Sequence, residues 1–534
     1  MSQRQSPGKY FTAIAPSKNL VYVGFVIGLV VSTCLVTNLV PSGGSTDVFL
    51  FRDAGCNLSL GLGFTSISLP GYGALERAVF ASYTPGLPLL FGVVASIFGC
   101  SAETNAWFNW FQAALASSLV VCVFPNLRIG AALRLTGGFG FGLLGPTGLL
   151  LPNTDRPELL AFSLFCLTCI VCAGVTRYRP FWGGGLAALT ALVHPLAGIL
   201  TALLAILSCQ AQAMPLGANL RWFWSLGSVR ISVQFGIALI SPLVFTWLVY
   251  SLLDPSAPGR FVAHAFGPSA GLGRQMMGFA DNLKHAFFSS GVTSKFYVLA
   301  NLVSFCSAAA LMFLWRQQLG NLQGLLLLAT LLSVGLIPIA LFPAQNNYML
   351  LSSLMLPIIL VMSAKLFHLG AVTPSGAATL GCLILFYAFA GSILSIAHRF
   401  TPMDDYRREL IALSQLSSEQ SLDRSKVVVL ANPNLYFLYK ARFPRLADYN
   451  FIGEQALHSE DIGGFVACLR GLRPETPLPT PAPFARRYEL IKAPGPPSFS
   501  KAFGIQLMKS DMSWSCAVYR VWPAPGLPAG HRAD

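Results

Sequence analysis

The chain has 534 residues, of which 54% are hydrophobic and only 10% are charged, and its mean hydropathy is +0.61. Soluble domains usually carry about 25% charged residues, so this composition excludes an ordinary soluble globular protein. About eleven stretches approach the roughly 20 apolar residues that a helix needs to cross a bilayer. The composition therefore predicts a polytopic α-helical membrane protein. Basic cytoplasmic loops and anionic lipids explain the net charge of +14 better than nucleic acid does.

The N-terminus predicts an uncleaved signal anchor. Residues 1–19 carry three basic residues, and the apolar run 20–40 that follows is too long for the core of a cleaved signal peptide. Because basic flanks stay on the inner side of a membrane, we expect 1–19 to be cytoplasmic.

An outer loop, 41–105, follows the first apolar run and begins with Asp47, Arg52 and Asp53. It contains a short apolar stretch, 85–99, which holds two prolines. If this stretch lies at the membrane surface, the later basic turns fall on the cytoplasmic side, as the positive-inside rule favours. We therefore expect 85–99 to be interfacial.

The other apolar stretches predict ten further transmembrane helices. Two of them, 181–193 and 196–209, are short and are joined only by His194 and Pro195. Irregular backbone at membrane depth is tolerated only inside protein or beside a water-filled cavity, so we expect this pair to turn back at a cavity open to the outer side. The ten stretches are 106–124, 131–151, 158–175, 181–193, 196–209, 231–252, 295–315, 322–342, 348–367 and 377–397.

Beyond this transmembrane module, 20–397, the composition becomes polar and rich in proline. This predicts a small α/β domain over 398–524 on the outer side, and a disordered tail at 525–534. The segment "KVVVLANPNLYFLYKAR" is typical of a buried strand, an Asn-Pro turn and an amphipathic helix, and "WSCAVYRVW" of a late strand. Cys468 and Cys516 could form a disulfide if the domain is exported.

Four connections bring ionisable side chains to the outer face of the expected bundle. Such groups are costly at membrane depth and usually serve a function. A carboxylate can act as a base, and Arg or His can hold a phosphate. The groups, in chain order, are Asp47, Arg52, Asp53, Glu76, Arg77, Asp155, Arg156, Glu158, His194, Asp254, Arg260, His264, Arg274, Asp281, Lys284 and His285.

The order of these features resembles the GT-C superfamily of membrane glycosyltransferases, which use polyprenyl-phosphate-linked sugars. After Asp47 the chain continues with Asn57-Leu58-x-x-Gly61-x-Gly63-Phe64, then with "SYTPGLPLL" and a short apolar stretch ending in "IFG". In that superfamily an acid follows the first span, and a proline-rich segment precedes an interfacial stretch ending in Phe-Gly.

Three later features continue the resemblance, which covers roughly residues 20–400. "DRPE" at 155–158 is similar to the second acidic turn of the superfamily. His194-Pro195 is similar to its basic residue before Pro or Gly, between two short spans. Asn347-Tyr348 is similar to its late Arg-Tyr turn, with Asn in place of Arg.

The resemblance implies an inverting single displacement on the outer face, expected at a bacterial inner (plasma) membrane. Asp47 would be the general base on the acceptor, and polyprenyl phosphate would leave. His194, Arg156 and Arg52 are candidates to hold that phosphate. The other candidate substrate-binding residues are Asp53, Asp155, Glu158, Asn347 and Tyr348. The partners would be a polyprenyl-phosphate-linked sugar, a glycan, lipid or protein acceptor of the envelope, and membrane lipids, with no nucleic acid.

Other interpretations stay open. A divalent metal ion could bind between Asp47 and either Asp155 or Glu158 through oxygen ligands, although the sequence requires no cofactor. Asp47, Asp155 and Glu158 are also ordinary residues for a helix start. Asp53 could pair with Arg52, and His194 could be a satisfied buried histidine.

Two other functional classes compete with the glycosyltransferase. A transporter or flippase for lipid-linked glycans predicts charged groups at both ends of a path, whereas here they cluster on one side. A non-catalytic membrane assembly protein would leave Asp47 and Asp155 far apart.

Overall fold

The computed structural model describes part of the first outer loop, several helices that follow it and a C-terminal sheet. The described residues are 47–67, 78–81, 83–123, 156–173, 178–214, 220–266, 422–423, 425–431, 436–449, 460–469, 480–482, 485–493, 501–502, 505–506 and 515–523, with a few single positions elsewhere. Apart from such single positions, six expected spans lie outside the described residues: 20–40, 131–151, 295–315, 322–342, 348–367 and 377–397.

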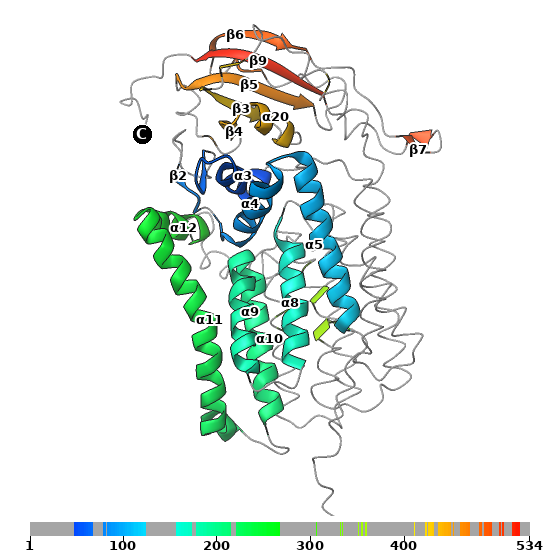
Figure 1. The fold of residues 1–534 in the computed structure, drawn as a ribbon, viewed down its shortest axis with the longest axis vertical. Coiled ribbons are helices and arrows are strands. Elements are labelled where there is room, and N and C mark those ends of the chain that lie inside the picture. The colour runs from blue at the N-terminus through cyan, green and yellow to red at the C-terminus, as the bar shows by residue number, and fades with distance from the viewer. Residues whose placement is uncertain are drawn as a thin grey trace, which may run out of the picture.

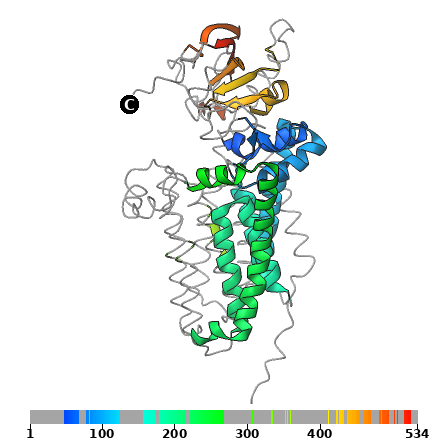
Figure 2. The same cartoon turned by 90° about the vertical axis from the view of Figure 1, so that its left-hand side faces the viewer.

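Five long helices run side by side in the lower part of the molecule (Figures 1 and 2). Their apolar sequences keep proline to the first turn, where no helical hydrogen bond is lost, except for Pro242 in α11. α9 packs against α8, α10 and α11, and α8 also packs against α5. The helices are α5 (Ala102–Val123), α8 (Glu158–Ala173), α9 (Arg179–Val193), α10 (Pro195–Ala213) and α11 (Leu226–Leu253).

Small residues let these helices approach closely. A Cβ atom added at Gly184 of α9 would lie 2.4 Å from the carbonyl oxygen of Phe235 in α11. One added at Gly198 of α10 would lie 2.4 Å from the Cα atom of Ala191 in α9. Only a residue without a side chain fits at these two contacts.

Among the described residues, α10 and α11 are long and apolar enough to cross a membrane, judged by length and composition alone. α10 is mostly covered by its neighbours, whereas α11 leaves most of its apolar side chains exposed. The transmembrane arrangement as a whole stays a prediction.

The described residues of 47–98, which belong to the expected first outer loop, fold into a layer of short elements above the long helices (Figure 1). Arg260 of α12 (Ala257–Phe266) donates to the carbonyl of Val79 in this layer at 3.2 Å, which ties α12 to it. The elements of the layer are α2 (Asp47–Phe51), α3 (Asp53–Ser59), β1 (Thr65–Ser66), β2 (Ala78–Val79) and α4 (Gly86–Phe98).

The C-terminal part forms a five-stranded sheet above this layer, in the order β4-β3-β5-β9-β6. β3 is parallel to β4 and β5, and β9 is antiparallel to β5 and β6. α20 connects β3 to β4 and lies between the sheet and α3 (Figure 1). The bounds are β3 (Val427–Ala431), α20 (Tyr436–Arg442), β4 (Leu446–Asp448), β5 (Ile462–Leu469), β6 (Ala485–Lys492) and β9 (Ser515–Pro523).

The strand and helix expected from "KVVVLANPNLYFLYKAR" are therefore confirmed as β3 and α20, and the part of "WSCAVYRVW" from Ser515 onward lies in β9. Cys516 is disulfide-bonded, and Cys468 stands opposite it in the ladder between β5 and β9. A short helix and a small hairpin complete the described elements: η5 (Leu220–Trp224), β7 (Lys501–Ala502) and β8 (Ile505–Gln506).

Candidate functional site

Phe51, the last residue of α2, contacts two other segments: the part of the first loop around Tyr83 and the turn before α8 that carries Arg156. Its buried ring meets the ring of Tyr83 edge-on, with the centroids 4.9 Å apart. The guanidinium carbon of Arg156 lies 5.9 Å from the centre of the same ring, within the range of a cation–π contact. Phe51 therefore lies where these three segments meet.

Arg156 and Glu158, which the sequence singled out in one turn, lie together with His194, which it singled out in another. The Nε atom of Arg156 donates to Oε1 of Glu158 at 2.9 Å. The Nε2 atom of His194 is 3.9 Å from the same oxygen, a close approach that is too long for a hydrogen bond. Glu158 and His194 are buried, and the side chain of Arg156 is 13% exposed. A cation, a carboxylate and an imidazole thus lie side by side, and of the three only the side chain of Arg156 is partly exposed.

His194 has a defined tautomer because it caps α10. Its Nδ1 atom accepts a hydrogen bond from the backbone N–H of Ala197 at 3.2 Å. A neutral imidazole that accepts through Nδ1 carries its proton on Nε2. Burial, and to a lesser extent the charge of Arg156, lower the pKa of His194 to about 3. The ring is therefore neutral near pH 7, with its Nε2–H group on the side of Glu158.

The outer loop also contacts the end of α9 just before His194. The Thr84 hydroxyl donates to the carbonyl of Val193 at 3.1 Å. A Cβ atom added at Gly86 would lie only 2.6 Å from the carbonyl oxygen of Leu192. The segment around Thr84 and Gly86 is thus fixed against the turn that carries His194.

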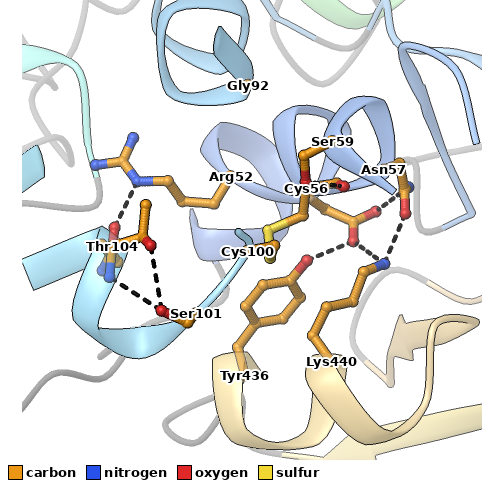
Figure 3. Close-up of a disulfide and its surroundings, with 12 residues drawn as sticks. Arg52, Cys56, Asn57, Ser59, Gly92, Cys100, Ser101, Thr104, Tyr436 and Lys440 are labelled. Carbon is orange, nitrogen blue, oxygen red and sulfur yellow. Dashed lines mark hydrogen bonds and ion pairs between the residues drawn. A yellow bond between two sulfur atoms is a disulfide. The ribbon is translucent and has the colours of Figure 1, made fainter. Parts of the chain in front are cut away.

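Arg52 is buried on the side of α5, where its guanidinium group donates to two amide oxygens. Nε bonds Oδ1 of Asn105 at 2.9 Å, and Nη2 bonds Oδ1 of Asn109 at 3.1 Å. The guanidinium carbon also lies about 5 Å from the ring centres of Phe91 and Phe108. These contacts fix the junction of α2 and α3 to α5 (Figure 3).

Asp53 points in a different direction, toward the C-terminal domain. Its Oδ1 atom accepts from the Tyr436 hydroxyl at 2.6 Å and from the Lys440 ammonium at 2.7 Å. Its Oδ2 atom accepts from Ser66 at 2.8 Å and from Asn57 at 3.2 Å. Figure 3 shows Tyr436 and Lys440 reaching from α20 toward α3. All five residues are buried, and Asp53 forms an ion pair with Lys440.

Tyr436 and Lys440 are not among the residues that the sequence predicts for the site. The available signal was weak: a lysine one helical turn after a tyrosine, inside the aromatic helix "YFLYKAR". That pattern predicts a solvated lysine on an amphipathic helix, whereas the structure buries Tyr436, Phe437, Leu438, Tyr439 and Lys440.

The other candidate residues lie partly or wholly outside the described residues. Asp47 begins α2, but its side chain is not described, and Asp155, Asn347 and Tyr348 lie outside. Within the described part of the chain, no three His, Cys, Asp or Glu side chains are grouped to hold a metal ion. Of the three proposed metal ligands only Glu158 can be placed, and it bonds Arg156. A metal site that includes Asp47 or Asp155 stays a prediction, since neither side chain is among the described ones.

A disulfide joins Cys56 of α3 to Cys100, just after α4, with the Cα atoms 5.2 Å apart. Gly55 brings the same helix against α4, since a Cβ atom there would lie 2.5 Å from the carbonyl oxygen of Pro88. Together with Arg52, these contacts hold α3 in place above the site.

Comparison of the chain with protein-family models and with curated proteins gives no match.

Proposed function

We propose that the chain is an integral membrane glycosyltransferase of the GT-C type. It would move a sugar from a polyprenyl phosphate to an envelope acceptor on the outer face, by an inverting single displacement. The observation that carries the proposal is the convergence of Arg156, Glu158 and His194 beneath α2, the helix that begins with Asp47.

The chemistry of this cluster suits a departing phosphate. As the acceptor oxygen bonds to the anomeric carbon, the bond from that carbon to the phosphate oxygen breaks, and the electron pair leaves with the phosphate. Arg156 supplies a permanent positive charge, and neutral His194 supplies an Nε2–H donor. Glu158 orients Arg156 through its hydrogen bond. Donors already held in place stabilise such a charge without reorganising.

Asp47 is proposed as the general base, which takes the proton of the acceptor. By helical spacing, positions 47 and 51 stand on the same side of α2, and Phe51 contacts Arg156. This arrangement favours a base on the side of α2 from which the phosphate would be bound.

Two further features support the proposed location. The 28 residues of α11 contain exposed aromatic and aliphatic side chains along their length, among them Val233, Ile240, Phe245 and Leu252, which suits contact with lipid. Disulfides form in oxidising compartments. The disulfide of Cys56 and Cys100, and the bonded Cys516, therefore favour an outer location for the first loop and for the C-terminal sheet.

The proposal can be tested with full-length protein in lipid nanodiscs and a panel of radiolabelled polyprenyl-phosphate sugars, with envelope extract as the source of acceptor. We expect the native protein to release polyprenyl phosphate and transfer label. Asp47→Asn should bind donor but not turn over. Arg156→Gln should weaken inhibition by added polyprenyl phosphate about tenfold or more, because a charge-assisted hydrogen bond contributes about 1.5–3 kcal/mol.

Glu489→Gln is the matched control, since Glu489 is an exposed carboxylate in the C-terminal sheet that pairs with Arg520. It should behave as the native protein does. Donor binding without turnover in the native protein, across the whole panel, would refute the enzyme and favour a transporter. Full activity of Asp47→Asn would refute the role of Asp47.

A further inference from the structure

We propose that Tyr436 and Lys440 of the C-terminal domain are positioning residues for the reaction, acting through α3 and α2. This inference rests on the proposed function for its catalytic part. Its structural part, that α20 fixes the place of α2, stands on contacts alone and can be tested alone.

Asp53 depends on α20 for two of its hydrogen bonds. Its carboxylate is buried and accepts four hydrogen bonds, two of them from α20. Lys440 also donates to Oδ1 of Asn57 at 2.8 Å, one turn further along α3. A buried carboxylate is tolerated only when it is paired and hydrogen-bonded. Asp53 therefore requires α20 in place, and the role of Asp53 is to hold α20 rather than to react.

α20 also contacts α2 directly. The ring of Tyr436 meets the ring of Phe49 edge-on, with centroids 4.9 Å apart. Phe49 and Phe51 are two positions apart, so they stand on nearly opposite sides of α2. Phe51 faces Tyr83 and Arg156, as described above. α2 is thus held between α20 on one side and the candidate site on the other.

The first loop and the C-terminal domain share one apolar core. Ile67 of the first loop packs in the cluster formed by Val427, Phe465 and Tyr519 of the sheet. Phe437 of α20 also contacts Phe91 of α4, with centroids 6.0 Å apart. The C-terminal domain therefore packs directly on the first loop, and a displacement of α20 would move α3 and α2 with it.

The consequence for catalysis follows from distance sensitivity. A misplacement of about 1 Å at a reacting centre can lower the rate about 100-fold. We therefore expect changes at Tyr436 or Lys440 to lower kcat about 100-fold while donor KM changes little, since both residues hold α3 and α2, whereas Arg156 and His194 are the proposed phosphate ligands.

The test uses full-length protein in nanodiscs and two readouts, hydrogen exchange of the amides in α2 and steady-state kinetics. Tyr436→Phe keeps the ring against Phe49 and removes only the hydroxyl, and Lys440→Met removes the charge. Both should raise amide exchange in α2 and lower kcat. Asp53→Asn combined with Lys440→Met removes both charges, so it should restore slow exchange and most of kcat relative to Lys440→Met.

The control is Arg520→Gln, which breaks an exposed ion pair of the same domain and should alter neither readout. Unchanged exchange in α2 of a folded Lys440→Met variant would overturn the inference, whether or not any donor is turned over. Faster exchange in α2 with native kcat would overturn the catalytic part of the inference. If the native protein turns over no donor, the proposed function fails, and the exchange readout still decides whether α20 fixes α2.

Discussion

Two neighbouring glycines of α9 should respond to alanine in opposite ways. At Gly184 an added Cβ atom would meet the carbonyl oxygen of Phe235 at 2.4 Å and the Cβ atom of Ala238 at 3.0 Å. The obstacle includes backbone, so α9 and α11 must move apart. Overpacking of this kind costs about 1–3 kcal/mol. The upper end applies here, and the gain in helix propensity of about 1 kcal/mol offsets part of it. We expect Gly184→Ala to lower the free energy of unfolding by about 2 kcal/mol.

At Gly185 an added Cβ atom would have nothing within 4 Å. Gly185→Ala should therefore keep the whole gain in helix propensity and stabilise the protein by about 1 kcal/mol. Denaturant titration of the three proteins in one detergent measures the difference, which should be about 3 kcal/mol between adjacent positions. Equal shifts of the same sign would refute the close contact of α9 with α11.

Three further predictions concern stability. Replacing Cys56 and Cys100 by serine together should lower the free energy of unfolding by about 4 kcal/mol, the value that loop-closure entropy gives for a bridge spanning 44 residues, and denaturant titration of the double variant measures it. The pKa of His194 in the folded protein is lowered to about 3, so between about pH 6.5 and 3 only the unfolded chain binds a proton at this residue. The free energy of unfolding should therefore fall by about 1.4 kcal/mol for each unit that the pH drops in this range. Denaturant titrations repeated at each pH measure this slope, and His194→Gln should remove it. Arg520→Gln should change the free energy of unfolding by less than about 1 kcal/mol, because the ion pair with Glu489 is exposed.

The sequence predicted the helices of the bundle closely where the structure describes them. The expected stretches 181–193 and 196–209 are α9, Arg179–Val193, and α10, Pro195–Ala213. Long apolar runs and prolines at first turns are local signals, so they can be recognised without knowledge of the fold. His194 was expected at their junction for the same reason, and it caps α10 there.

The partners of individual side chains could not be predicted in the same way. Asp53 and Arg52 are adjacent in sequence and could have paired, but α3 directs Asp53 to α20 and Arg52 to α5. Lys440 is 387 residues from Asp53, and no periodicity links positions so far apart. The bond of Cys56 with Cys100 likewise depends on how α3 and α4 cross. Arg156 and Glu158 were selected in one turn and His194 in another, and the packing of α8 against α9 and α10 brings the two turns together.

The separation between Asp53 and Lys440 also constrains how the chain is made. During synthesis α3 emerges long before α20, so the Asp53 carboxylate lacks Tyr436 and Lys440 until the chain has been translated past residue 440 of 534. The bridge to Cys100 closes over only 44 residues and can form much earlier. The first loop would therefore already hold its disulfide, whereas Asp53 would lack its two partners in α20 until that helix has been made. A chain that ends before residue 436 therefore cannot complete the hydrogen bonds of Asp53, even when the helices from α2 to α12 have formed.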